Sequence, residues 1–163
     1  MNELTAVVVL LAIVGGFLGW FWLAPGGVLS LRRIADGDLQ VDVRLAYSPS
    51  TLYRLLGKYG KKGRRSFQRM LLVDMVFPAV YGTSLYLLSD LLAALHETQL
   101  KAWSIAQIFA ISAAAFDYTE NALLLSIVRR FPARHVQLAR AASICTSLKM
   151  LSFFVAVFAL IAQ

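Results

Sequence analysis

Three carboxyl side chains and one amide lie inside otherwise apolar stretches of this chain. Asp117, Glu120 and Asn121 are spaced at i, i+3 and i+4, so a helix places them on one face. Asp74 lies about one turn inside another apolar stretch. An ionised side chain at the centre of a membrane helix costs about 2.5–3.5 kcal/mol on insertion scales, so it usually faces the interior of a bundle. The sequence therefore predicts that these four side chains share one intramembrane pocket.

Clustered carboxyl groups suit acid–base chemistry. Carboxylates that share a pocket repel one another, so at least one holds a proton near neutral pH unless a cation compensates the charge. A carboxyl group that gains and loses a proton can serve as general acid or base. We therefore take Asp117, Glu120 and Asp74 as candidate catalytic residues, and the candidate substrate-binding residues are Asn121, Tyr81, Lys149 and Tyr118.

Two further polar side chains are expected beside these carboxyls. Tyr81 follows Asp74 by seven residues and shares its helical face with Pro78, which should kink the helix there. Lys149 lies about ten residues into the last apolar stretch and can pair with either Asp117 or Glu120. Such a pair either fixes the helix register or belongs to a reaction or transport site. The sequence leaves both the partner and the role open.

The composition indicates a membrane protein. Of the 163 residues, 59% are hydrophobic and 15% are charged, whereas soluble domains are about 45–50% apolar and about 25% charged. About 20 apolar residues cross a hydrocarbon core of about 30 Å as a helix. We expect spans at about 4–24, 70–95, 102–128 and 139–162, with short polar links at 96–99 and 129–132. The predicted fold is an all-α integral membrane four-helix bundle, a single transmembrane domain over residues 1–163.

The basic residues predict the orientation. Ten of the sixteen Lys and Arg residues lie between Arg32 and Arg69, and four more lie between Arg129 and Arg140. The positive-inside rule then makes both loops cytoplasmic and puts both termini outside, in a bacterial inner membrane. We attribute the net charge of +7 to these loops rather than to nucleic-acid binding. One cysteine, Cys145, provides no disulfide and no metal-binding spacing, so neither a metal nor a cofactor is predicted.

The cytoplasmic loop over residues 28–66 should contain short ordered elements. Polar neighbours alternate with Leu39, Val41, Val43 and Leu45, which is typical of a short strand or extended segment. Ser48-Pro49 favours a helix start, and that helix should end near Gly60.

This loop helix is amphipathic. Its apolar face carries Leu52, Leu55, Leu56 and Tyr59. Basic side chains near it could contact lipid head groups, and the candidates are Lys58, Lys61, Lys62, Arg64 and Arg65. The apolar face therefore either enters an anionic membrane surface or packs under the bundle.

Glycines give the first span a face of small residues. Gly15 and Gly19 form a GxxxG spacing that lets another helix approach closely. We expect this face to pack within one chain, while a homo-oligomer remains the alternative.

Four short motifs resemble those of a family of small four-span bacterial membrane proteins that has no assigned activity. They are Tyr47-Ser48-Pro49 with Leu52-Tyr53, Tyr59-Gly60 with Gly63-Arg64-Arg65, Asp74 with Phe77-Pro78 and Tyr81, and Phe116-Asp117 with Glu120-Asn121. The resemblance covers roughly residues 40 to 130. It implies the four-span topology and marks these residues as one set, without naming a reaction.

Three functions fit these features. The first is binding of, or acid–base chemistry on, a lipid-like or isoprenoid molecule in the membrane. The second is proton- or cation-coupled transport by an oligomer, and the third is a non-catalytic scaffold that contacts membrane lipids or a partner. A route from the lipid to the carboxyls favours the first, a polar path through both leaflets the second, and a fully paired, closed cluster the third.

Overall fold

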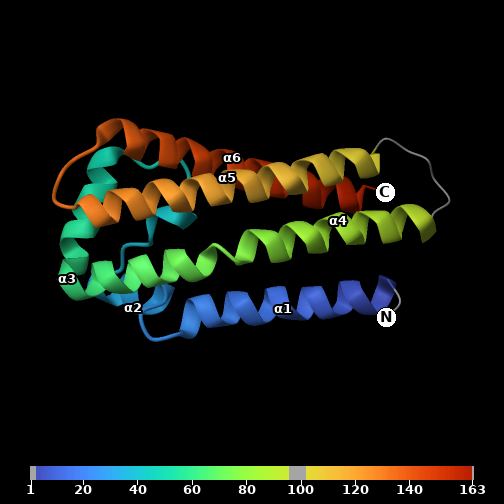
Figure 1. Ribbon diagram of the computed structural model, residues 1–163, viewed down its shortest axis with the longest axis horizontal. Helices are drawn as coiled ribbons and strands as arrows, with labels where there is room; N and C mark the ends of the chain where they lie inside the picture. Colours follow the sequence, from blue (N-terminus) through green and yellow to red (C-terminus); the bar gives the residue numbers. More distant parts are fainter. Residues whose placement is uncertain (1–2, 96–101, 163) are drawn as a thin grey trace.

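The computed structural model describes residues 3–95 and 102–162, and the link expected at 96–99 lies outside these residues. The helices are α1 (Glu3–Leu23), α2 (Val28–Ile34), the 3-10 helix η1 (Val41–Val43), α3 (Pro49–Asp74), α4 (Phe77–Leu95), α5 (Ala102–Arg130) and α6 (Val136–Ile161). The long helices run side by side along the longest axis (Figure 1). Both termini lie at one end, and α2 and the first part of α3 lie at the other.

The predicted all-α four-helix architecture is confirmed. Four helical segments of the described chain are long and apolar enough to cross a membrane: Leu4–Ile34, Pro49–Ala94, Ile105–Arg130 and Val136–Ile161. Helix α5 packs along both α6 and α4, and α1 packs against α4 at the edge of the bundle. The three helices α4, α5 and α6 therefore form the centre of the bundle, and α1 flanks it.

Helix α3 begins where the sequence predicts. The Ser48 hydroxyl accepts a hydrogen bond from the Thr51 amide at 3.2 Å, and Pro49 occupies the first turn. The helix expected to end near Gly60 is instead interrupted there, because Gly60 adopts φ 59° and ψ −173°, and a helix resumes at once. The first part of α3 therefore crosses the end of the bundle before the chain turns along its axis (Figure 1).

The apolar face of this first part packs against protein. Its four apolar side chains, Leu52, Leu55, Leu56 and Tyr59, are at most 4% exposed and belong to a core that includes Leu124 of α5. Burial of each large apolar side chain contributes roughly 1.5–3 kcal/mol. Of the two alternatives for this helix, the structure supports packing under the bundle.

The second span is a broken helix. Helix α3 ends at Asp74, two turn residues follow, and α4 begins at Phe77. Pro78 has no amide hydrogen to donate to the carbonyl of Asp74, four residues earlier, which explains the break. The expected disruption by Pro78 is thus present, and it lies directly beside the Asp74 side chain.

The strand or extended segment expected over residues 39–45 is absent from the described chain. Val41–Val43 form a 3-10 helix instead. The alternation also fails, because Gln40, Val41 and Asp42 are buried in succession while Val43 and Leu45 are exposed. This segment has no neighbouring strand to pair with, and its conformation follows from packing against α6.

The glycine face of α1 does not pack within the chain. A Cβ atom added at Gly15, Gly16 or Gly19 would meet no atom within 4 Å. The expectation of close packing inside one chain is therefore wrong, because α1 turns other residues toward α4 and leaves these glycines on its outer surface. The dimer alternative stays a prediction.

Asp38 joins the loop to helix α3. Its carboxylate lies 3.0 Å from the Arg44 guanidinium and 3.1 Å from the Lys58 ammonium, and it also pairs with Arg54. The hydrogen bonds from Arg54 and Lys58 hold the pKa of Asp38 well below its usual range. Asp38 therefore stabilises the folded chain in its ionised form.

Replacement of Asp38 by asparagine is expected to lower thermal stability at pH 7. A carboxyl whose pKa is depressed by folding contributes stability above its ordinary pKa, near 3.9, and loses it as pH falls further. The difference between wild type and Asp38→Asn should therefore shrink below about pH 4, as followed by thermal unfolding in detergent. Asp36→Asn is the matched control, because the Asp36 side chain is 79% exposed and Lys58 is its only ion-pair partner among the described residues; an equal loss in both variants would contradict this assignment.

Candidate functional site

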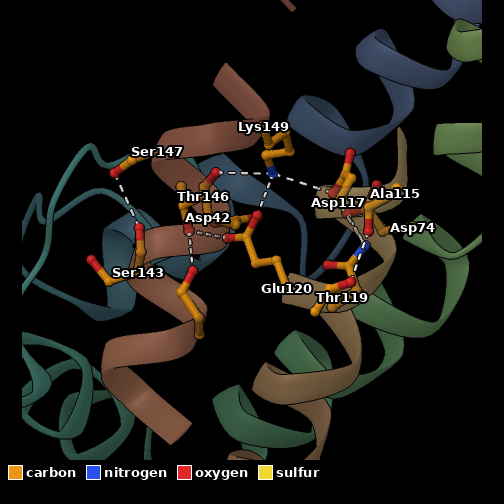
Figure 2. Close-up of polar contacts among 12 residues, drawn as sticks. Asp42, Asp74, Ala115, Asp117, Thr119, Glu120, Ser143, Thr146, Ser147 and Lys149 are labelled. Atoms are coloured by element: carbon orange, nitrogen blue, oxygen red, sulfur yellow. Dashed lines mark hydrogen bonds and ion pairs between the residues drawn. The ribbon is translucent and has the colours of Figure 1, made fainter. Parts of the chain in front are cut away.

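A group of buried polar side chains lies in the middle of the bundle, and we call it the carboxyl cluster. Its members come from the loop, α3, α4, α5 and α6, and they are Asp42, Asp74, Tyr81, Asp117, Glu120, Asn121, Thr146 and Lys149. Each of them except Lys149 is at most 9% exposed. The predicted convergence of Asp74, Asp117, Glu120 and Asn121 is thus confirmed, with Lys149 facing them from α6 (Figure 2).

Asp74 and Asp117 share one amide group. The Asn121 side-chain nitrogen donates to Asp74 Oδ2 at 2.9 Å and lies 3.4 Å from Asp117 Oδ1. These contacts fix the orientation of the amide, since its nitrogen must face the carboxyl groups. One amide group therefore holds two carboxyl groups that come from different helices, α3 and α5.

Lys149 joins Asp117 to Glu120. Its ammonium lies 3.2 Å from Asp117 Oδ1 and 2.6 Å from Glu120 Oε2. It also donates to the backbone carbonyl of Asp42 at 3.4 Å. The sequence left open whether Lys149 pairs with Asp117 or Glu120, and the structure shows both. The Lys149 side chain is only 15% exposed.

A hydroxyl group on α6 also contacts Glu120. The Thr146 hydroxyl donates to Glu120 Oε1 at 2.6 Å, and Thr146 lies about one helical turn before Lys149. Helix α6 therefore holds the Glu120 carboxyl group through both of its oxygens.

Asp42 is the member of the cluster that sequence reasoning missed. It lies between two valines in the loop, and no helical spacing links it to the spans. Burial raises the pKa of Asp42 above its usual range, and the nearby charge of Lys149 opposes this rise. Within the cluster, one ammonium group therefore faces four carboxyl groups.

Two buried acceptors in the cluster lack donors among the described residues. They are Asn121 Oδ1 and Asp42 Oδ1. An unsatisfied buried acceptor costs about 1–3 kcal/mol, so each favours the binding of a group that donates a hydrogen bond. The cluster is therefore not fully paired within the described chain.

Tyr81 connects the carboxyl cluster to an aromatic row. Its hydroxyl donates to Asp117 Oδ2 at 3.2 Å, and its ring lies 5.2 Å from Phe77 and 5.8 Å from Phe153, measured between centroids. The Phe153 ring in turn contacts the ring of Phe154, which is 65% exposed on the outside of α6. A series of ring contacts thus connects the outer face of α6 to the phenol that donates to the Asp117 carboxyl.

Tyr118 is not part of the cluster contacts. It lies on another face of α5 and lines a groove of about 400 Å³ between α4 and α5, together with Pro78, Gly82 and Tyr86. Residues adjacent in sequence point about 100° apart on a helix, so Tyr118 cannot follow Asp117 into the cluster. This placement does not support its prediction as a residue of the same binding site.

The residues proposed for lipid head groups fall into two sets. Lys58 pairs with Asp36 and Asp38, and Arg64 donates to the Leu56 carbonyl and lies 4.2 Å from the centre of the Phe131 ring. The other three, Lys61, Lys62 and Arg65, are exposed. Only this second set presents its charges outward.

Comparisons with known proteins give no relative. No known protein family, curated protein or solved structure that was compared with the chain matches it. In the described residues, no three His, Cys, Asp or Glu side chains are arranged to hold a metal ion.

Proposed function

We propose that this membrane protein binds an apolar, lipid-like or isoprenoid molecule and carries out acid–base chemistry on its polar end. The observation that supports this most is the position of Tyr81, which joins an exposed aromatic row to the Asp117 carboxyl. The ligand would lie along the aromatic rings, and its donor group would reach the carboxyl cluster. The unpaired acceptors Asn121 Oδ1 and Asp42 Oδ1 suit such a donor, for example a hydroxyl group.

The proposed roles follow from the contacts. Asp117 acts as the base that takes up the proton, because Asn121, Tyr81 and Lys149 all donate to it and stabilise its ionised form. Asp74 is the second carboxyl of the pair, and Glu120 holds Lys149 in place. Four residues of the sequence motifs, Asp74, Tyr81, Asp117 and Asn121, all belong to the cluster.

The proposed function is tested by identifying what the protein retains. Wild type purified in a mild detergent is extracted with organic solvent, and bound molecules are identified by mass spectrometry. We expect an apolar molecule with a hydrogen-bond donor in wild type and a strong reduction of it in Tyr81→Phe. Tyr118→Phe is the matched control, because that phenol lies outside the cluster. Equal retention by all three proteins would contradict the proposal.

Proton- or cation-coupled transport is the second candidate. It is favoured by the broken helix beside Asp74 and by further polar residues toward the end of the bundle that carries the termini. There the buried Gln107 donates to the exposed Asp90 at 2.6 Å. Proteoliposomes with a pH-sensitive dye inside distinguish the two functions. Proton influx that requires Asp117, with no retained molecule, would favour transport.

We propose the orientation in which the basic loops are cytoplasmic and both termini face outward. The described termini lie at the same end, opposite α2 and the basic part of α3, which supports an even number of spans (Figure 1). In a Cys145→Ser background, an impermeant maleimide should leave Lys61→Cys unlabelled in intact cells and should label Glu97→Cys. Labelling of Lys61→Cys would reverse this orientation.

A further inference from the structure

A second pocket lies away from the carboxyl cluster, where the end of α1 meets α3. Its volume is about 420 Å³. Trp20 of α1 and the turn at Gly26 line one side, and Ser66, Arg69 and Val73 of α3 line the other. The pocket thus combines one basic and one hydroxyl side chain with apolar walls.

The turn at Gly26 brings the backbone close to α3. Gly26 adopts φ +87°, which favours glycine, and a Cβ atom there would lie 3.0 Å from the Ser66 Cβ atom. A side chain at this position would therefore push the turn away from Ser66. The polar end of the pocket depends on this close approach.

The charges around the pocket lack internal partners. Arg69 is exposed and has no ion pair or hydrogen bond in the described residues. Lys62 and Arg65 precede it by seven and four residues on α3, so the three side chains share one helical face and are all exposed. This stripe differs from Lys58 and Arg64, whose charged groups contact the protein itself.

The apolar part of the pocket faces outward. Trp20 is 48% exposed, Leu72 is 47% exposed and Val73 is 37% exposed, and all three line the pocket. Tryptophan is enriched where a membrane span reaches the head-group region, and Trp20 lies in the last turn of α1. The lining of the pocket therefore suits a phosphate group next to the start of an acyl chain.

We propose that this pocket binds an anionic phospholipid. Arg69 and the Ser66 hydroxyl contact its phosphate group, and an acyl chain lies along Leu72, Val73 and Trp20. Lys62 and Arg65 add attraction for the anionic head group along the same face. This site is independent of the ligand proposed for the carboxyl cluster, since the two share no residue.

The test is binding of phosphatidylglycerol to the full-length protein in detergent, measured by native mass spectrometry against phosphatidylcholine. Wild type should prefer phosphatidylglycerol. Arg69→Gln should weaken this binding about five-fold, which corresponds to about 1 kcal/mol for one basic group at an anionic surface. Arg140→Gln is the matched control, because Arg140 is also exposed on a span but lines none of these walls.

Each result decides the proposal. Equal affinity for the two lipids in wild type, or equal weakening in Arg69→Gln and Arg140→Gln, would overturn it. A third arm adds millimolar inorganic phosphate. Displacement of the lipid by phosphate alone would assign the pocket to a soluble anion. Retention of the lipid supports a site that binds both the phosphate group and the acyl chain.

Discussion

Replacement of Lys149 by methionine is expected to lower the free energy of unfolding by about 3–5 kcal/mol, the usual cost of removing one partner of a buried ion pair. Methionine fills a similar volume but leaves the carboxyl groups of Asp117 and Glu120 without the ammonium that lies 3.2 and 2.6 Å from them. The Asp42 carbonyl also loses a donor. Unfolding by denaturant in mixed micelles measures the change.

Two further variants separate charge from packing. Lys62→Met removes an exposed lysine from α3 and should change stability by less than about 0.5 kcal/mol. In the double variant Lys149→Met with Glu120→Gln, one of the unpaired charges is gone, so stability should recover in part. A Lys149→Met protein as stable as wild type would show that the ion pairs do not hold the cluster together.

The part of the cluster that could be predicted is the part that lies on regular helices. Asp117, Glu120 and Asn121 share a face through the helical repeat alone, and the cost of exposing a charge to lipid sends that face inward. The positions of Asp74 and Lys149 could be predicted because antiparallel spans of known length bring together residues that lie at a similar depth. The helical repeat and the cost of exposing a charge to lipid thus predict most of the residues of the site.

Asp42 could not be predicted for the opposite reason. Its segment has no regular repeat, and Gln40, Val41 and Asp42 are buried together by packing of the loop against α6. An alternating pattern indicates a strand only where another strand can pair with it, and none is described here. The position of Asp42 is therefore a product of tertiary contacts, which local sequence does not encode in a simple pattern.

Sequence patterns also failed to predict what covers an apolar face, because more than one neighbour suits the same residues. The face of Leu52, Leu55, Leu56 and Tyr59 suits a lipid surface and a protein core equally, and only the position of α5 shows that it packs on protein. The glycines of α1 likewise suit a neighbouring helix in the same chain or in another one. Apolar periodicity predicts a buried face but does not name what covers it.

The largest functional effect is expected from Asp117→Asn. The substitution keeps the size of the side chain and its ability to bond with Tyr81 and Asn121, but it removes the proton that the carboxyl exchanges. Loss of a general acid or base usually lowers the rate about 10²- to 10⁴-fold. Once the retained molecule is identified, its conversion by the purified protein measures this loss.

The neighbouring carboxyls should respond differently, and this difference distinguishes chemistry from structure. Glu120→Gln retains the Thr146 hydrogen bond but loses the shorter of the two ion pairs with Lys149, so it should reduce stability more than Asp117→Asn does. Asp74→Asn should lower activity less than Asp117→Asn, because Asp74 contacts the shared amide of Asn121 but has no bond to Tyr81 in the described contacts. If Asp117→Asn changed only the unfolding temperature and left conversion intact, the cluster would be a structural ion-pair network and the proposed chemistry would be wrong. The asparagine still fills the same buried space between α4 and α6. A loss of activity with an unchanged unfolding temperature would therefore assign the effect to proton exchange by the Asp117 carboxyl.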